Sequence, residues 1–124
     1  MKFRLTKDFY FEAAQTLPKA PAGHKCKQMH GHSFKLEVTV EGERDPETGW
    51  VYDHAKISQA MKPLMEELDH GYLNEIEGLE NPTIENMCEW FWSKLSPSLP
   101  GLAEIVVHET PTARCSFRGP QAAS

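Results

Sequence analysis

The sequence predicts an α+β fold, a four-stranded antiparallel sheet with two helices packed on one face. Three observations indicate it: two segments of alternating apolar residues open the chain, two segments with helical spacing follow, and two more strand-like segments close it. The length of 124 residues fits one domain, residues 1–120, with a short polar tail at 121–124. One face of such a sheet stays uncovered, so we expect a homo-oligomer.

The first strand is predicted from the odd-numbered apolar residues between Phe3 and Ala13. Gln15 shares this parity, so its side chain is expected to face the interior beside Phe11. Residues 16–29 contain prolines and a glycine and predict a loop that carries Cys26 near its far end. Loops of this length are usually functional.

The second strand begins at the two histidines and continues to about Gly42, followed by a turn at 45–49 and a short extension at 50–52. His30 and His32 are two residues apart in it, so both should project to the face that carries Phe34. Two imidazoles on one face can hold one metal ion, and Cys26 precedes them by four residues. A polar strand end and a buried cysteine are the alternative interpretations.

Two helices follow. Apolar residues recur at helical spacing after Asp53, which can cap a helix over 54–68, and Asp69-His70-Gly71 is expected to end it with glycine in the left-handed conformation. Thr83 can cap a second helix that ends before Pro97. Residues 103–109 and a segment through Arg118 then complete the sheet.

Composition excludes several classes of protein. The net charge is −5 and the basic residues are scattered, which argues against a nucleic-acid surface. No apolar run approaches the ~20 residues that cross a bilayer. Three cysteines without a Cys-x-x-Cys pair do not form a disulfide framework, so we expect a cytoplasmic protein that binds a small molecule.

The chain resembles the 6-pyruvoyl-tetrahydropterin synthase family, and within it the bacterial 6-carboxy-5,6,7,8-tetrahydropterin synthase branch of queuosine biosynthesis. The resemblance runs nearly from end to end. It rests on motifs that follow one another in order: FEAA at 11–14, GHKC at 23–26, HGHSF at 30–34, TGWVYD at 48–53, LDH at 68–70, YLN at 72–74, NPT at 81–83, EN at 85–86 and ET at 109–110.

The resemblance implies a fold, an assembly and a reaction. The fold is the tunnelling fold, in which three subunits close a barrel and two such rings often stack, giving a trimer or a dimer of trimers. The reaction is the zinc-dependent conversion of 7,8-dihydroneopterin triphosphate to 6-carboxytetrahydropterin, acetaldehyde and triphosphate. A pyruvoyl-forming synthase of the same family is an alternative.

Site residues are also implied by the resemblance. His30 and His32 would be Zn²⁺ ligands, and zinc would polarise the substrate's side chain. Cys26, as the thiolate, would abstract a side-chain proton, and Asp69 would orient His70 as a proton shuttle. Glu109 would bind the amino group and ring NH of the pterin.

One position departs from the family pattern. The family's first strand reads Ala-Ala-His, in which the histidine is the third zinc ligand, whereas this chain reads Ala13-Ala14-Gln15. An amide oxygen is a poorer zinc ligand than imidazole, so Gln15 would be a weak ligand. His24 is a minor candidate to replace it. A paralogue that binds pterins with an impaired zinc site is therefore a second hypothesis.

Overall fold

The computed structural model describes residues 1–120, and the predicted polar tail at 121–124 lies outside them. Its strands and helices follow the predicted order, with one addition. The strands are β1 (Lys2–Gln15), β2 (His30–Glu43), β3 (Gly71–Tyr72), β4 (Leu102–Thr110) and β5 (Ala113–Phe117), and the helices are α1 (His54–Leu68) and α2 (Ile84–Leu95). Short 3₁₀ helices occupy Lys25–Lys27 and Leu73–Glu75.

The sheet has five strands in the order β3-β1-β2-β4-β5, so the predicted count of four was wrong. β1 and β2 pair antiparallel along their whole length, from Lys2 opposite Glu43 to Gln15 opposite His30. The added strand β3 pairs parallel with the end of β1, and the sheet is therefore mixed. Two residues are too few to show an alternating pattern, which is why β3 could not be predicted.

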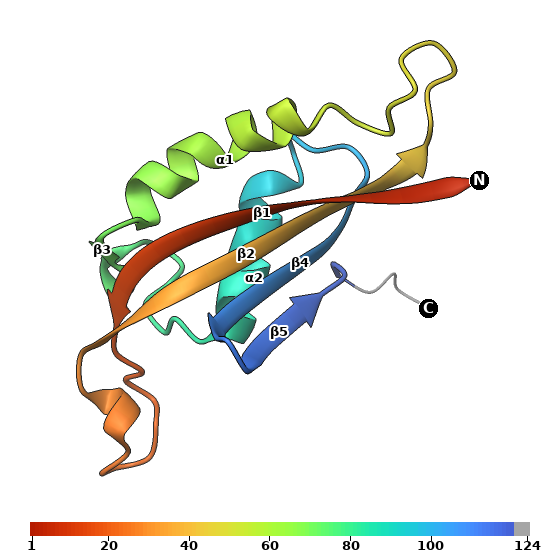
Figure 1. The fold of residues 1–124 in the computed structure, drawn as a ribbon. Helices are drawn as coiled ribbons and strands as arrows, with labels where there is room; N and C mark the ends of the chain where they lie inside the picture. Colours follow the sequence, from red (N-terminus) through yellow and green to blue (C-terminus); the bar gives the residue numbers. More distant parts are fainter. Residues whose placement is uncertain (121–124) are drawn as a thin grey trace.

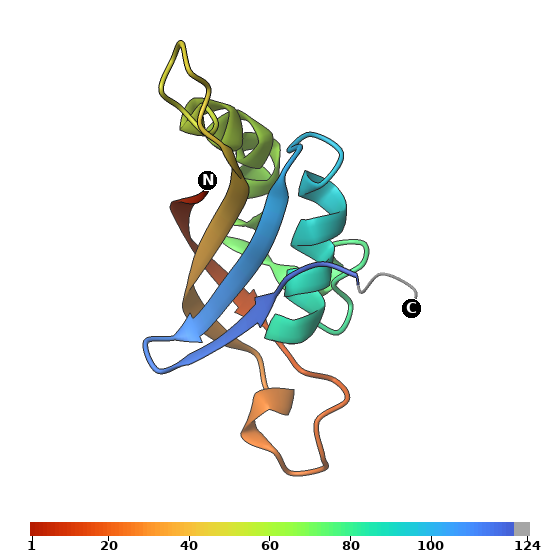
Figure 2. The same ribbon diagram turned by 90° about the vertical axis from the view of Figure 1, so that its right-hand side faces the viewer.

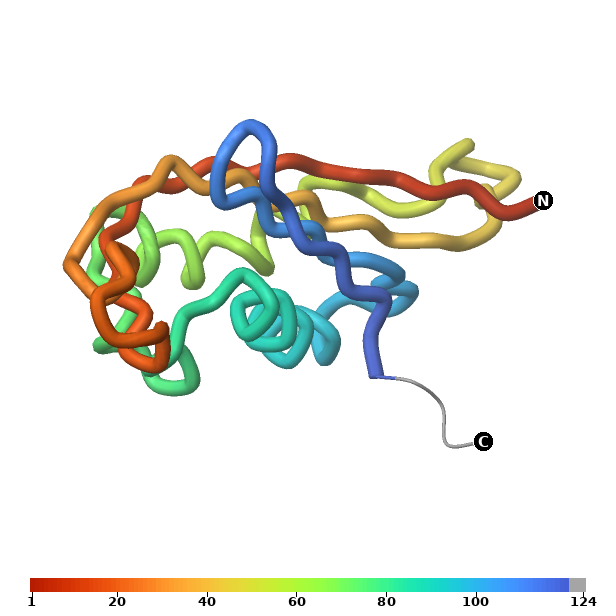
Figure 3. The backbone as a smooth tube through the Cα atoms, turned by 90° about the horizontal axis from the view of Figure 1, so that it is seen from below, coloured from red at the N-terminus to blue at the C-terminus, as the bar shows by residue number. Residues whose placement is uncertain are grey.

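Both helices lie on one face of the sheet, as predicted, with α1 against β1 and α2 against β4 and β5 (Figures 1 and 2). The apolar residues of the strands meet the helices there, because period-two alternation places them on one face. Aromatic rings fill the centre of this layer: Phe11 stacks on Phe34 at 5.1 Å between centroids and packs at 6.2 Å against Phe91 of α2. Viewed from below, both helices lie on the same side of the strands (Figure 3).

The end of α1 differs from the prediction in detail. The residue in the left-handed conformation is His70, with φ of 61°, rather than Gly71. Glycine is required next to it for another reason, since a Cβ at Gly71 would lie 2.9 Å from the carbonyl oxygen of Glu67. The tight exit lets β3 start at once beside β1, where His70 N donates to the carbonyl oxygen of Glu12 at 2.6 Å.

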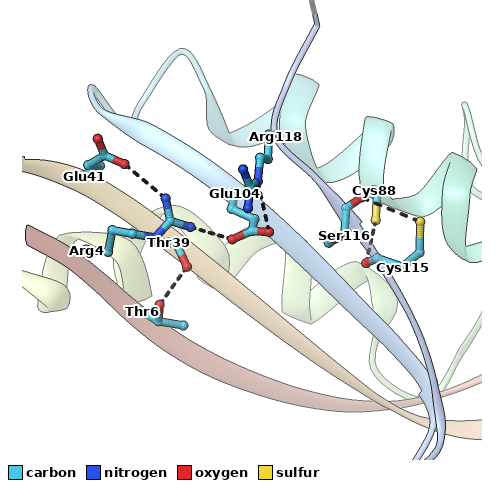
Figure 4. Close-up of polar contacts among 9 residues, drawn as sticks. All are labelled: Arg4, Thr6, Thr39, Glu41, Cys88, Glu104, Cys115, Ser116 and Arg118. Carbon is cyan, nitrogen blue, oxygen red and sulfur yellow. Dashed lines mark hydrogen bonds and ion pairs between the residues drawn. The ribbon is translucent and has the colours of Figure 1, made fainter.

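The other face of the sheet carries polar side chains that pair with one another (Figure 4). Arg4 bonds to Glu41 at 3.0 Å and to Glu104, and the hydroxyls of Thr6 and Thr39 are 2.7 Å apart. The predicted extension at 50–52 forms no strand. In residues 1–120 no helix is long and apolar enough to cross a membrane.

Candidate metal and ligand site

Three strands bring polar side chains together at one end of the sheet. β1 ends at Gln15, β2 begins at His30 directly opposite, and β4 ends next to Glu109. Gln15, His32 and Glu109 continue the parities of the core residues Phe11, Phe34 and Val107, so their side chains lie on the helix-covered side. The sequence prediction that Gln15 faces inward is confirmed, because only 1% of its surface is exposed.

His30 is oriented by the backbone that precedes it. Its Nδ1 lies 2.8 Å from the carbonyl oxygen of Gln28, which can only accept, so in the neutral imidazole Nδ1 carries the proton and Nε2 has the free lone pair. A metal-binding histidine is typically fixed in this way by a bond from its other ring nitrogen. His32 packs edge-on against it, with 4.8 Å between ring centroids. The carbonyl of Gln28 had no sequence signal, because any residue could provide it.

Glu109 reaches into this pair of histidines. Its Oε1 lies 3.2 Å from His32 Nε2 and accepts a hydrogen bond of 3.2 Å from Gln15 Nε2. Ligand atoms of His30, His32 and Glu109 all lie within 4.8 Å of one another, so the three could hold a metal ion. The family resemblance implied Gln15 as a weak third ligand of this group and gave Glu109 a different role, that of binding the pterin ring.

Two buried acceptors at this point have no hydrogen-bond partner. They are Gln15 Oε1 and His30 Nε2, and among residues 1–120 only Asn81 Oδ1 shares this property. Buried polar atoms without partners are rare in folded proteins and call for an explanation such as an ion. Two imidazoles and a carboxylate form a ligand set known for catalytic zinc. The residues present therefore fit a divalent metal such as zinc.

Cys26 shares a cavity with the histidines. The cavity is ≈ 550 Å³, a size that suits a small molecule, and its lining includes Cys26, His30, His32 and Glu109. The Cys26 loop is tied to the end of β1 by a 2.8 Å bond from Leu17 N to the carbonyl oxygen of Cys26. His24, considered as a substitute metal ligand, instead accepts a bond from Cys26 N at 3.1 Å and so caps the 3₁₀ helix.

Asp69 and His70 form a second group, away from Cys26. Asp69 Oδ1 accepts from Glu12 N at 2.9 Å, and its Oδ2 lies 3.1 Å from His70 Nδ1. The bond from Glu12 and the neighbouring His70 hold the pKa of Asp69 below its usual value, although partial desolvation opposes them. The predicted pairing of Asp69 with His70 is therefore present.

His70 lines a different cavity, of ≈ 370 Å³, together with Glu12 and Ser33 of the sheet's polar face. This cavity shares only Gly31 and His32 of β2 with the one that holds Cys26. Cys26 and His70, to which the family resemblance assigns roles in one reaction, thus line different cavities within one chain.

Comparison with known proteins gives consistent results. The sequence profile described as 6-pyruvoyl tetrahydropterin synthase matches residues 4–120. A 6-carboxy-5,6,7,8-tetrahydropterin synthase of Synechocystis is 40% identical over 121 residues, which cover 93% of this chain and 92% of that protein. A dihydroneopterin monophosphate aldolase of Pyrococcus furiosus is 37% identical, with 82% of each chain covered.

Solved structures show the same fold. The 6-pyruvoyl tetrahydropterin synthase of Caenorhabditis elegans superposes with a TM-score of 0.88 at 26% identity, covering 97% of both chains. An uncharacterised protein of Wolinella succinogenes superposes with a TM-score of 0.74 at 17% identity, covering 97% of this chain and 99% of the other. The second likeness concerns the fold alone.

Proposed function

Because the chain belongs to the 6-pyruvoyl tetrahydropterin synthase family, we propose that it is a 6-carboxy-5,6,7,8-tetrahydropterin synthase of queuosine biosynthesis. It would convert 7,8-dihydroneopterin triphosphate to 6-carboxytetrahydropterin, acetaldehyde and triphosphate. The observation that carries this proposal is the convergence of Cys26, His30, His32 and Glu109 on one cavity. The 40% identity to a 6-carboxytetrahydropterin synthase along nearly the whole chain supports this product.

His30 and His32 would hold Zn²⁺, since the free lone pair of His30 Nε2 lies beside the ring of His32. Bound zinc would polarise the hydroxyls of the substrate's side chain and favour the thiolate of a nearby cysteine. Cys26, whose loop lines the same cavity, would remove a proton from that side chain. Glu109 would accept hydrogen bonds from the pterin ring.

Asp69 and His70 would act on the cavity of a neighbouring copy. Within one chain His70 and Cys26 line different cavities, and His70 is exposed, with 81% of its side-chain surface accessible. A trimer or dimer of trimers would place the polar cavity of one subunit against another subunit. His70, held by Asp69, would then move the second proton of the reaction.

The test is turnover by the purified protein. Dihydroneopterin triphosphate should give 6-carboxytetrahydropterin and acetaldehyde in equal amounts, and a parallel assay should use the monophosphate. A 6-pyruvoyl product, or turnover of the monophosphate alone, would assign the chain to another activity of its relatives. Tight pterin binding without turnover would favour the binding paralogue.

Mixing inactive variants tests the shared site. Cys26→Ala and His70→Ala should each be inactive alone, and mixed after dissociation and reassembly they should recover part of the activity, because some sites receive both intact residues. A Cys26→Ala/His70→Ala double variant, mixed with wild-type protein in the same way, is the control. No recovery in mixed oligomers would show that both residues act within one chain.

The cytoplasm is the compartment that we propose for this enzyme. Cys26, Cys88 and Cys115 are all free thiols, and the reducing environment of the cytoplasm keeps cysteines in this form. Burial, and to a lesser extent the neighbouring Cys115, raises the pKa of Cys88 to about 12, so this thiol stays protonated and inert.

A further inference from the structure

We propose that Glu109 is the third protein ligand of the metal centre, and that Gln15 positions the Glu109 carboxylate instead of binding the metal itself. The inference deepens the proposed function, on which it rests for the choice of zinc. Metal binding can be measured without any pterin, so the two proposals can fail separately.

Distances support the carboxylate as ligand. Tetrahedral zinc with bonds of about 2.0–2.1 Å places its ligand atoms roughly 3.3 Å apart. Glu109 Oε1 and His32 Nε2 are already 3.2 Å apart, and the ligand atoms of His30, His32 and Glu109 lie within 4.8 Å of one another. Small side-chain rotations would close the remaining distance, since about a quarter of Glu109 and His32 is exposed and free to adjust (24% and 22%).

Charge also favours Glu109 over Gln15. In this partly buried site a carboxylate adds a direct charge attraction to a divalent cation, which a neutral amide oxygen lacks, so Glu109 is the stronger ligand of the two. Glu109 Oε1, which faces the histidines, is the atom that would bind. No hydrogen bond or ion pair engages Glu109 Oε2 within the described chain, so this oxygen stays free for a ring donor of the substrate.

Gln15 has the geometry of a positioning residue. Its Nε2 donates to Glu109 Oε1 at 3.2 Å, across 94 positions of sequence, and its side chain is nearly fully buried. A carboxylate bound to a metal is commonly held by a second hydrogen bond of this kind, and losing that bond typically costs 10- to 100-fold in metal affinity. A histidine at position 15 would have no such role, because it would itself be a ligand.

The experiment is a titration with Zn²⁺, repeated with Co²⁺ for its visible absorption spectrum, on metal-stripped protein. Glu109→Gln should weaken Zn²⁺ binding by about 100-fold or more and change the Co²⁺ spectrum, while Gln15→Met should weaken binding by about 10-fold. In the Glu109→Gln background, Gln15→Met should have little further effect, because the carboxylate that it positions is gone. A merely loosened site would instead give additive losses.

Glu37→Gln is the matched control, since Glu37 also faces a histidine, His108, across β2 and β4 but lies outside the cluster. It should leave Zn²⁺ affinity unchanged. Gln15→His supplies a third imidazole, and in that background Glu109→Gln should lose most of its effect on affinity.

Unchanged Zn²⁺ affinity in Glu109→Gln, together with a large loss in Gln15→Met, would overturn the proposal and make Gln15 the ligand. Should Glu109→Gln fail to fold, Glu109→Asp replaces it. That variant keeps the charge but withdraws the carboxylate by one methylene, and it too should bind Zn²⁺ more weakly.

Discussion

The strands β1, β2 and β4 carry polar side chains at both ends, but the two ends satisfy them differently. At the end where β1 begins, Arg4 pairs with Glu41 and Glu104 on the polar face of the sheet. Glu104 also pairs with Arg118 at 3.7 Å (Figure 4). At the other end, Gln15 Oε1 and His30 Nε2 are buried acceptors without a donor. Polar groups that form hydrogen bonds or ion pairs within the protein contribute to its stability. Buried polar groups without such a partner are available to bind a ligand.

Because of this difference, substitutions at the two ends should affect different properties of the protein. Changes at the cavity end should lower activity or metal affinity with little loss of stability, and changes at the paired end should do the reverse.

Cys26→Ala should lower kcat/KM for dihydroneopterin triphosphate by about 10²-fold or more, the usual loss when an acid–base group is removed. Its free energy of unfolding should stay the same, because Cys26 lies in a loop outside the core. Steady-state rates and urea unfolding measure the two quantities. Cys115→Ala, remote from the cavity, should keep its activity. More than about a tenth of wild-type activity in Cys26→Ala would exclude it as the base.

Gln15→Met should raise the free energy of unfolding of the metal-free protein by about 1 kcal/mol, because it removes a buried acceptor that has no partner. The same substitution is expected to weaken metal binding, so stability and function would move in opposite directions. Urea unfolding in the presence of chelator measures the gain. A loss of stability there would mean that the Gln15–Glu109 hydrogen bond outweighs the unsatisfied oxygen.

Glu104→Gln, a change of the same kind as Glu109→Gln on the same strand, should lower the free energy of unfolding by about 0.5–1 kcal/mol at low salt. Glu104 is the shared partner of Arg4 and Arg118, and the pairs are partly exposed, so 1 M salt should remove most of the effect. Zn²⁺ affinity and turnover should not change. A loss of metal affinity as large as that of Glu109→Gln would contradict the separation of the two ends.

Much of the fold could be predicted because its signals are local. The parity of β1 correctly predicted that Gln15 faces the interior. The capping residues Asp53 and Thr83 correctly predicted where the two helices begin. Both caps are formed, since Asp53 accepts from Ala55 N and Thr83 accepts from Asn86 N. The two histidines on one face of β2 followed from the same alternation.

The contacts of Glu109 could not be predicted, because they depend on the register between β2 and β4, which pairs Lys35 with His108. No local pattern encodes a pairing between segments more than 70 positions apart. The sequence therefore identified Gln15 as the unusual residue but not the hydrogen bond that it donates to Glu109. The separation of His70 from Cys26 was missed for the same reason, since it follows from where β3 joins the sheet.

Asp69→Asn should have the smallest effect on the free energy of unfolding, and this effect should depend on pH. The pKa of Asp69 is lowered in the folded protein, chiefly by the bond from Glu12 N, so its ionised form stabilises the fold. That contribution is fully present above the pKa that an aspartate has in the unfolded chain, and it is lost as the pH falls through the lower folded-state pKa. Wild-type protein should therefore be more stable than Asp69→Asn at neutral pH, and the difference should shrink toward zero in acid.

Urea midpoints of the two proteins, compared at pH values from about 7 down to about 2, measure the effect, because the other carboxylates titrate equally in both and cancel. The asparagine amide oxygen can still accept from Glu12 N, so the variant isolates the charge rather than the hydrogen bond. A difference that stays constant across this range would show that the charge of Asp69 does not stabilise the fold. Turnover should nevertheless fall in Asp69→Asn, because His70 loses the carboxylate that orients it.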